Sequence, residues 1–220
     1  MTDDVVLLIE RGDVRRAQGD MSGALESYEA GLAIATRLAA SDAGNAGWQR
    51  DLSVSHNKIG DVRVSQGDVS GALESYEASH AIFKRLAASD AGNAGWQRDL
   101  SVSHDKIGDV RWGQGDVSGA LESYEAGLAI ATRLAASDAG NAGWQADLAA
   151  SYGKLGQIHL ASGKAETALG LFRAGREIVA PLAGASGHAR WRGYLENFDI
   201  DIAHAEAAKA ADDGIRSKTV

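Results

Sequence analysis

Two segments of the sequence contain residue types that can do nucleophilic chemistry, one with serine, histidine and aspartate and one with serine and aspartate. The segment 51–56 reads Asp-Leu-Ser-Val-Ser-His, and Ser70 lies in the segment Gly-Asp-Val-Ser-Gly at 67–71. These are the residue types of a catalytic triad, in which a base activates a serine for attack on a carbonyl carbon. A triad needs members that converge from different parts of a fold, whereas each of these groups lies on one short segment. We therefore predict no catalytic residue and no enzymatic activity, with Asp68 capping a helix and Ser70 in its first turn.

The sequence offers no clear metal or cofactor site. Because it contains no cysteine, disulfides, thiol nucleophiles and Cys-ligated metal centres are excluded. His56 and His104 are candidate ligands, but Leu8 and Tyr152 stand at the same 48-residue spacing on either side. Since leucine and tyrosine replace them, we interpret these histidines as packing residues. No glycine-rich phosphate loop follows a strand, so we predict neither a metal nor a cofactor.

Composition and charge narrow the class of partner. The 220 residues carry a net charge of −8, with 45% hydrophobic and 24% charged residues, which are ordinary values for a globular chain. A negative surface repels phosphate backbones and anionic lipids, so we expect neither a nucleic acid nor a membrane as partner. Residues 1–10 contain acids, and their apolar run is too short for a signal peptide, so we expect a cytoplasmic protein.

The chain is built from an internal repeat of 48 residues. The block Gly12–Ile59 returns as Gly60–Ile107 and as Gly108–Leu155, and a diverged fourth copy begins at Gly156. The first two blocks differ at only eight positions. Repeated small units predict a solenoid, in which each unit contacts its neighbours and the core continues along the stack.

Each repeat reads as a helical hairpin. Trp48, Leu52, Ile59 and Val62 fall on one face of a helix, which Gly67 then ends. A second helix follows, and a turn-rich segment at 89–95 ends it before the next tryptophan. No segment alternates with a period of two, so we expect no sheet. The tryptophans that open the units are expected to wedge the joints between hairpins; they are Trp48, Trp96 and Trp144.

The repeat resembles the tetratricopeptide repeat (TPR). The resemblance rests on Ile59-Gly60, Gly67-Asp68, Ala72-Leu73 and Tyr76, with equivalents in the other units. The sequence departs from the TPR pattern at His56 and Arg63, lacks the closing proline, and has a period of 48 rather than 34 residues. It looks like the long TPR variant found in tandem in bacterial proteins. The resemblance implies an all-α, right-handed α-solenoid of stacked antiparallel helix pairs with a C-terminal capping helix.

We expect one solenoid domain. Its predicted extent is 1–211, with units at about 3–41, 45–89, 93–137 and 141–183, a capping helix at 188–211 and a frayed tail at 212–220. The segment Val5–Ile9 is apolar on every side, although it opens the first unit. We interpret it as an unfinished edge, which packs on another chain or lies inside a longer array.

The TPR resemblance also implies where a partner binds. In that family the inner side of the first helix faces the ligand, and three of the eight differences between the first two blocks fall on this side. We define the helix-A face as the matching positions of each unit. The predicted partner-binding residues on it are Asn57, Asp61, Val64, Ser65, Asp105, Asp109, Trp112, Gln157 and Leu160.

A ladder of aspartates marks this face. Asp13, Asp61 and Asp109 repeat at one position, with Trp112 as an apolar anchor beside them. Such a ladder favours a basic or amphipathic segment over an acidic one. A competing interpretation is that the lysines one helical turn earlier neutralise the ladder through i,i+3 pairs; they are Lys58 and Lys106.

These features predict a non-enzymatic scaffold that binds a peptide or a helix of a partner protein in a concave groove. The alternative is self-assembly, in which near-identical units stack head to tail or exchange hairpins into a homo-oligomer through the N-terminal edge.

Overall fold

The computed structural model describes residues 2–186 and 189–218, and this part of the chain forms nine α-helices and no strand. The all-α fold class is therefore confirmed. The helices are α1 (Thr2–Ala17), α2 (Met21–Ser41), α3 (Ala46–Ser65), α4 (Val69–Ser89), α5 (Ala94–Gly113), α6 (Val117–Ser137), α7 (Ala142–Ala161), α8 (Ala165–Ser186) and α9 (Ala189–Lys218).

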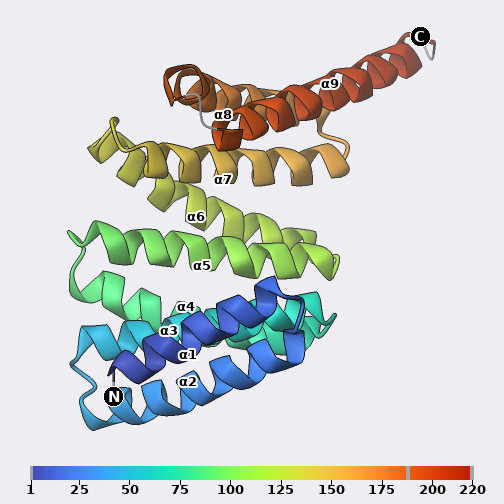
Figure 1. The fold of residues 1–220 in the computed structure, drawn as a ribbon. Helices are drawn as coiled ribbons and strands as arrows, with labels where there is room; N and C mark the ends of the chain where they lie inside the picture. The colour runs from blue at the N-terminus through green and yellow to red at the C-terminus, as the bar shows by residue number, and fades with distance from the viewer. Residues whose placement is uncertain (1, 187–188, 219–220) are drawn as a thin grey trace. The chain divides into compact units, whose positions relative to one another are not determined.

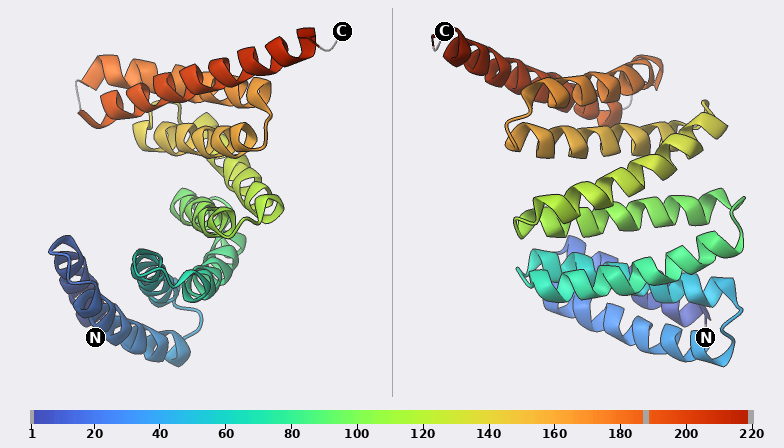
Figure 2. Two further views of the ribbon diagram at one scale, coloured as in Figure 1. Left: turned by 90° about the vertical axis from the view of Figure 1, so that its right-hand side faces the viewer. Right: turned by 180° about the vertical axis from the view of Figure 1, so that it is seen from behind.

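The helices, which Figure 1 labels in chain order, form two compact units, Met1–Asp116 and Val117–Val220. The first unit holds α1 to α5, in which α1 packs on α2, α2 on α3, α3 on α4 and α4 on α5 (Figure 2). The second holds α6 to α9, again with each helix packed on the next. Each unit is thus a stack of antiparallel helix pairs. We call α1, α3, α5 and α7 the first helices of the repeats, and α2, α4, α6 and α8 the second helices.

Short polar signals fix the ends of the helices. Asn45 accepts a hydrogen bond from the backbone N–H of Trp48 at 3.1 Å, and Asp68 accepts one from that of Gly71 at 3.0 Å. Both are N-caps, as the sequence predicts for Asp68. Gly67 has φ 78°, and the backbone N–H of Asp68 returns to the carbonyl of Arg63 at 2.9 Å. This left-handed glycine ends α3 and turns the chain into α4.

Within a hairpin, a glycine lets an aromatic ring approach the backbone. A Cβ atom on Gly60 would lie 2.5 to 3.0 Å from three ring atoms of Tyr76. Gly12 lies in the same way against Tyr28. The side chain of Tyr76 is buried in this contact. The two helices of a repeat therefore lie closer together here than any larger residue would allow.

Between hairpins, the first helix of one repeat packs on the second helix of the repeat before it. Ile59 and Val62 of α3 lie in one buried cluster with Ala24 and Tyr28 of α2. The same four positions of the next repeat form the cluster of Ala72, Tyr76, Ile107 and Val110. Trp48 packs at the same joint, against the cluster that contains Val5, Ala35 and Leu38, as the wedge interpretation predicts.

Helix α9 packs on α8 in the same way that the first helix of a repeat packs on the second helix of the repeat before it. Phe198 and Ala205 are buried in one cluster with Ala168 and Phe172 of α8. The capping position that the sequence predicts is thus occupied, although His188, its expected first residue, lies outside the described residues. The helix runs to Lys218, beyond the point where a frayed end is expected. Residues 219–220 of that expected tail also lie outside the described residues.

The segment Val5–Ile9 is apolar on all sides but only partly covered. Val5 is buried against α2 and α3, whereas Val6 and Leu7 are 46% and 60% exposed. Val14, which lies two helical turns after Leu7 on the same face of α1, is 56% exposed. The helix α1 therefore presents an apolar strip to its surroundings. Of the helices described, none has the length and apolar character that crossing a bilayer requires.

The contact between Gly60 and Tyr76 makes a testable prediction. In the Gly60→Ala variant, the added methyl group would overlap with ring atoms of Tyr76, so α3 and α4 must separate. We therefore expect a loss of about 1–3 kcal/mol in the free energy of unfolding. The measurement is urea unfolding followed by circular dichroism. Gly170→Ala is the control, because no atom lies within 4 Å of the added Cβ and alanine favours a helix. A Gly60→Ala protein as stable as the wild type would show that the ring contact is not tight.

Candidate interaction surface on the first helices

The structure places the predicted partner-binding residues on three helices in two units. The first unit holds those on α3 and α5, and the second unit holds those on α7. Val64 and Ser65 are exposed, Asp61 is about one fifth exposed, and Asn57 and Trp112 are half-buried. In the complete set, α3 carries Asn57, Asp61, Val64 and Ser65, α5 carries Asp105, Asp109 and Trp112, and α7 carries Gln157 and Leu160.

Asp61 contacts side chains from three other helices. Its Oδ1 accepts a hydrogen bond from the hydroxyl of Tyr76 on α4 at 2.7 Å and one from Nζ of Lys106 on α5 at 2.5 Å. The guanidinium of Arg16 on α1 lies 3.8 Å from Oδ2. The ammonium of Lys106 also lies 5.1 Å from the centre of the Tyr76 ring, a cation–π distance. Asp61 is therefore a structural contact between hairpins. We call this arrangement of Asp, Tyr and Lys the carboxylate joint.

The first repeat has the same carboxylate joint. Asp13 accepts a hydrogen bond from the hydroxyl of Tyr28 at 2.6 Å, and its two oxygens accept bonds from Nζ of Lys58 at 2.6 and 2.8 Å. Burial alone would raise the pKa of Asp13, but the bonds from Lys58 and Tyr28 hold this pKa below its usual value. Burial and the neighbouring carboxylate raise the pKa of Tyr28, so the hydroxyl stays protonated and donates a hydrogen bond to Asp13.

The lysines pair differently from what the sequence predicts. Lys58 lies three residues before Asp61, and an i,i+3 pair on one helix is the expected contact. Instead, Lys58 reaches back to Asp13 and Lys106 reaches back to Asp61, each across the joint to the preceding hairpin. The expectation of i,i+3 pairs is therefore wrong. Because Asp13 and Asp61 already have cationic partners, their negative charge gives little support to the idea that they attract a basic segment.

The last joint of the chain has different chemistry. In the second unit, Gln157 stands at the aspartate position, Phe172 at the tyrosine position and Asp201 of α9 at the lysine position. The apolar part of the joint is kept, because Ile202 packs against the cluster that contains Phe172 and Ala205. Burial raises the pKa of Asp201, while a hydrogen bond from Gln157 partly offsets this rise. An amide and a carboxylate thus replace the ion pair of the other joints.

One column of the helix-A face differs in every repeat. Arg16, Val64, Trp112 and Leu160 stand at the same position near the end of each first helix. Val64 is 48% exposed, although it is apolar. Leu160 is half-buried and packs against the cluster around Phe172. Arg16 lies against Asp61 of the carboxylate joint, whereas Val64 and Trp112 form no bond in that joint. The exposed Val64 is therefore open to contacts outside the repeat.

A histidine pair at the α4–α5 joint was not expected from the sequence. Nδ1 of His80 lies 2.9 Å from Oγ of Ser103, and its ring packs edge-on against the ring of His104, with 4.4 Å between the ring centres. Burial lowers the pKa of both histidines, that of His104 to about 4, with the neighbouring cation Lys84 acting in the same direction. The signal in the sequence is that His80 replaces the leucine that stands at this position in the first and third repeats, Leu32 and Leu128.

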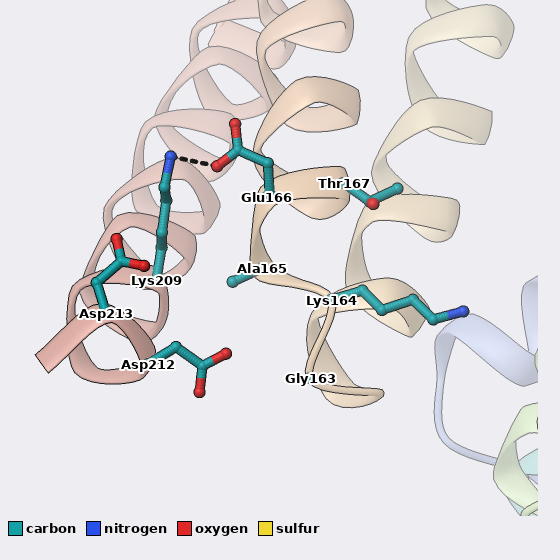
Figure 3. Close-up of a pocket in the computed structure, with 8 residues that line it drawn as sticks. All are labelled: Gly163, Lys164, Ala165, Glu166, Thr167, Lys209, Asp212 and Asp213. Atoms are coloured by element: carbon teal, nitrogen blue, oxygen red, sulfur yellow. Dashed lines mark ion pairs between the residues drawn. The ribbon is translucent and has the colours of Figure 1, made fainter. Parts of the chain in front are cut away.

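Two hollows lie in the second unit. One, of about 430 Å³, lies where α9 passes the start of α8, and Figure 3 shows Lys209 paired with Glu166 across it. Asp212 and Asp213 of α9 also line it, and so does Lys164, whose side chain points away from these aspartates in Figure 3. The other, of about 360 Å³, lies between α7 and α9, and we call it the α7–α9 hollow. Across residues 2–186 and 189–218, no group of three or more histidine or acidic side chains is arranged to hold a metal ion.

Comparison with known proteins identifies the fold. No protein-family model matches the sequence, and no curated protein matches it. A Podosopora anserina protein described as a kinesin light chain with nearly identical TPR-like repeats matches with a TM-score of 0.68 at 19% identity, over 99% of this chain and 92% of that chain. The fold is that of TPR-like repeats.

Two further solved structures match over part of their own length. BtubC from P. vanneervenii matches with a TM-score of 0.64 at 19% identity, over 82% of this chain. The apo form of RapI matches with a TM-score of 0.65 at 14% identity, over 92% of this chain. The matched regions cover 65% of BtubC and 53% of RapI, less than two thirds of either.

The carboxylate joint is expected to stabilise the first unit. Asp61→Asn weakens the bonds from Tyr76 and Lys106 and leaves the partly buried ammonium of Lys106 without its anion, so we expect a loss of about 1–3 kcal/mol in the free energy of unfolding. The double variant Asp61→Asn, Lys106→Met should lose less than the sum of the single variants. Arg173→Gln breaks a more exposed pair with Glu206 and is the control. Equal effects of Asp61→Asn and Arg173→Gln in urea unfolding would contradict this role.

The histidine pair predicts a pH dependence of stability. The unfolded chain protonates a histidine near pH 6.5, whereas the folded chain protonates His104 only near pH 4, so the unfolded state binds more protons between these values. We therefore expect stability to fall as the pH drops from about 6.5 to about 4. The double variant His80→Leu, His104→Tyr carries residues found at these positions in other repeats and should show a flatter profile. Urea midpoints across this range give the comparison, and parallel profiles would refute the prediction.

Proposed function

We propose that this protein is a non-enzymatic interaction module that binds a peptide or a helix of a partner protein on its helix-A face. The observation that carries the proposal is the variable column of the first helices, where the exposed and apolar Val64 stands beside side chains that the joints hold in place. Exposed apolar groups on a rigid framework are typical of binding surfaces. The TPR-like fold of the solved neighbours supports this use of the framework.

The contribution of each predicted residue differs in this proposal. Val64, Ser65 and Trp112 are the contact residues that we favour in the first unit, because the carboxylate joint does not use them. Asp61 orients the surface through its bonds to Tyr76 and Lys106. Asn57 has a buried Oδ1 without a hydrogen-bond donor among the described residues, so it lies beneath the contact surface. In the second unit, Gln157 and Leu160 keep their place as proposed contacts.

Self-association is the second candidate, and the exposed strip of α1 favours it. Val6, Leu7 and Val14 are each between 46% and 60% exposed on a helix whose other face packs on α2. Covering this strip with a second copy would remove apolar surface from water. The second candidate therefore places the contact on α1, away from the column that contains Val64.

Photocrosslinking in cells can separate the two candidates. A photoreactive benzoylphenylalanine is placed at position 64, 160, 7 or 36 in separate proteins, and crosslinked products are identified by mass spectrometry. We expect crosslinks to another protein from positions 64 and 160, because these lie on the helix-A face. Thr36 is the control, since it is exposed on the second helix α2.

The outcomes point in different directions. Crosslinks from position 36 but not from 64 or 160 would refute binding on the helix-A face. Crosslinks from position 7 alone, between two copies of this chain, would replace the proposal with self-association.

A further inference from the structure

The α7–α9 hollow is an open site beside the helix-A face of the second unit. It has a volume of about 360 Å³ and lies between Gly153 and Gln157 of α7 and Tyr194, Phe198 and Asp201 of α9. Its walls therefore combine two aromatic rings and the carboxylate of Asp201 with the side chain of Lys154 on α7. Gln157 is one of the predicted partner-binding residues, so the hollow adjoins the proposed binding surface.

The hollow exists in this repeat because Gly153 has no side chain. Asn57 and Asp105 occupy the same position of the second and third repeats and are half-buried there. A Cβ atom at Gly153 would lie 3.6 and 3.7 Å from the ring of Phe198, which is ordinary contact. A side chain at this position is thus sterically possible, and its absence leaves space beside Phe198.

Asp201 brings a negative charge to this space without a matching cation. In the two joints of the first unit, the position of Asp201 holds a lysine that pairs with an aspartate: Lys58 pairs with Asp13 and Lys106 with Asp61. Here the partner is the neutral amide of Gln157, and no described cation lies within ion-pair distance of Asp201. His204, on the next turn of α9, is the basic group whose charge acts on it. The carboxylate of Asp201 thus lacks the ion pair that Asp13 and Asp61 have in the first unit.

Two basic groups lie at the hollow, since Lys154 lines it and Arg190 stacks on Tyr194, which also lines it. The ammonium of Lys154 lies 5.4 Å from the centre of the Tyr124 ring on α6. The guanidinium of Arg190 lies 5.4 and 5.7 Å from the ring centres of Trp191 and Tyr194. Neither forms an ion pair with Asp201. The carboxylate is therefore available to a cation that comes from outside the chain.

We propose that the α7–α9 hollow binds the side chain of a lysine or arginine residue of the partner, with the cation on Asp201 and the aliphatic stem against Phe198 and Tyr194. This proposal rests on the proposed function and adds the chemistry of one contact. A long cationic side chain fits because its stem is apolar and its end is charged. An acidic side chain would be repelled by Asp201, and an uncharged apolar one would leave that carboxylate desolvated without a partner.

The test is a titration of the 15N-labelled protein with short peptides. The probes are three acetylated and amidated tripeptides with glycine at both ends and arginine, glutamine or glutamate in the centre. The backbone amides of Gly153 and Asn197 report on the hollow, since both residues line it. We expect saturable shifts with the arginine peptide and affinity at least about ten-fold weaker with the glutamine peptide.

Two variants and one control make the test specific. Asp201→Asn removes the charge but keeps a group that can bond to Gln157, and Gly153→Asn fills the hollow with the side chain found in the second repeat. Each is expected to weaken arginine-peptide binding at least about ten-fold. Asp199→Asn is the control, because Asp199 pairs with Arg176 on α8 and does not line the hollow. Circular dichroism confirms that each variant is folded.

Each outcome decides the proposal. No saturable shift with the arginine peptide, equal affinity of the wild type and Asp201→Asn, or tighter binding of the glutamate peptide would overturn it. Crosslinks from the helix-A face together with no binding in the hollow would overturn this contact alone and leave the proposed function standing. Binding in the hollow without crosslinks from that face would overturn the proposed function and leave the hollow as a binding site for a cationic side chain.

Discussion

The hydrogen-bonded carboxylate of Asp61 is the contact on which the packing of the first unit depends. It lies on α3 and contacts Tyr76 of α4, Lys106 of α5 and Arg16 of α1, so one side chain links four helices. The buried apolar clusters between hairpins, such as Ile59 and Val62 against Ala24 and Tyr28, contribute more free energy, since full burial of each large apolar side chain contributes about 1.5–3 kcal/mol. Apolar surfaces are tolerant of sliding, however, whereas hydrogen bonds have fixed directions. The carboxylate joint therefore sets the register in which the apolar side chains meet.

This division of roles explains which positions stay constant along the chain. Residues of the two kinds of joint recur, because a change at one of them must be matched in the neighbouring hairpin. The column of Arg16, Val64, Trp112 and Leu160 holds a different side chain in every repeat, and Val64 and Trp112 in it form no bond in the carboxylate joint. The second unit shows the same logic at its last joint, where Gln157 and Asp201 change together. Val64, which is exposed, can thus vary without a matching change in a neighbouring hairpin.

The sequence predicts the helices well and the contacts between them less well. The 48-residue period, the caps at Asp68 and Gly67 and the tryptophan joints are local or periodic signals, and each lies where it is predicted. The partner of Lys58 is different, because the repeat gives Lys58 and Lys106 two candidate aspartates each, one on the same helix and one in the preceding hairpin. Only packing decides between them. The histidine pair and the α7–α9 hollow likewise depend on which helices lie side by side.

Near-identical repeats could exchange hairpins between two copies of the chain, but two residues of α1 oppose such an exchange. At the positions of Lys58 and Ile59, the first repeat has Glu10 and Arg11. If α1 of one copy took the place of α3 in another, Glu10 would face the carboxylate of Asp13, and Arg11 would enter the buried site of Ile59, which is 3% exposed. Both changes are costly, because like charges repel and a buried cation needs a partner. Val14 keeps the apolar character of this face, so contact through α1 remains open to a surface that differs from the chain's own joints.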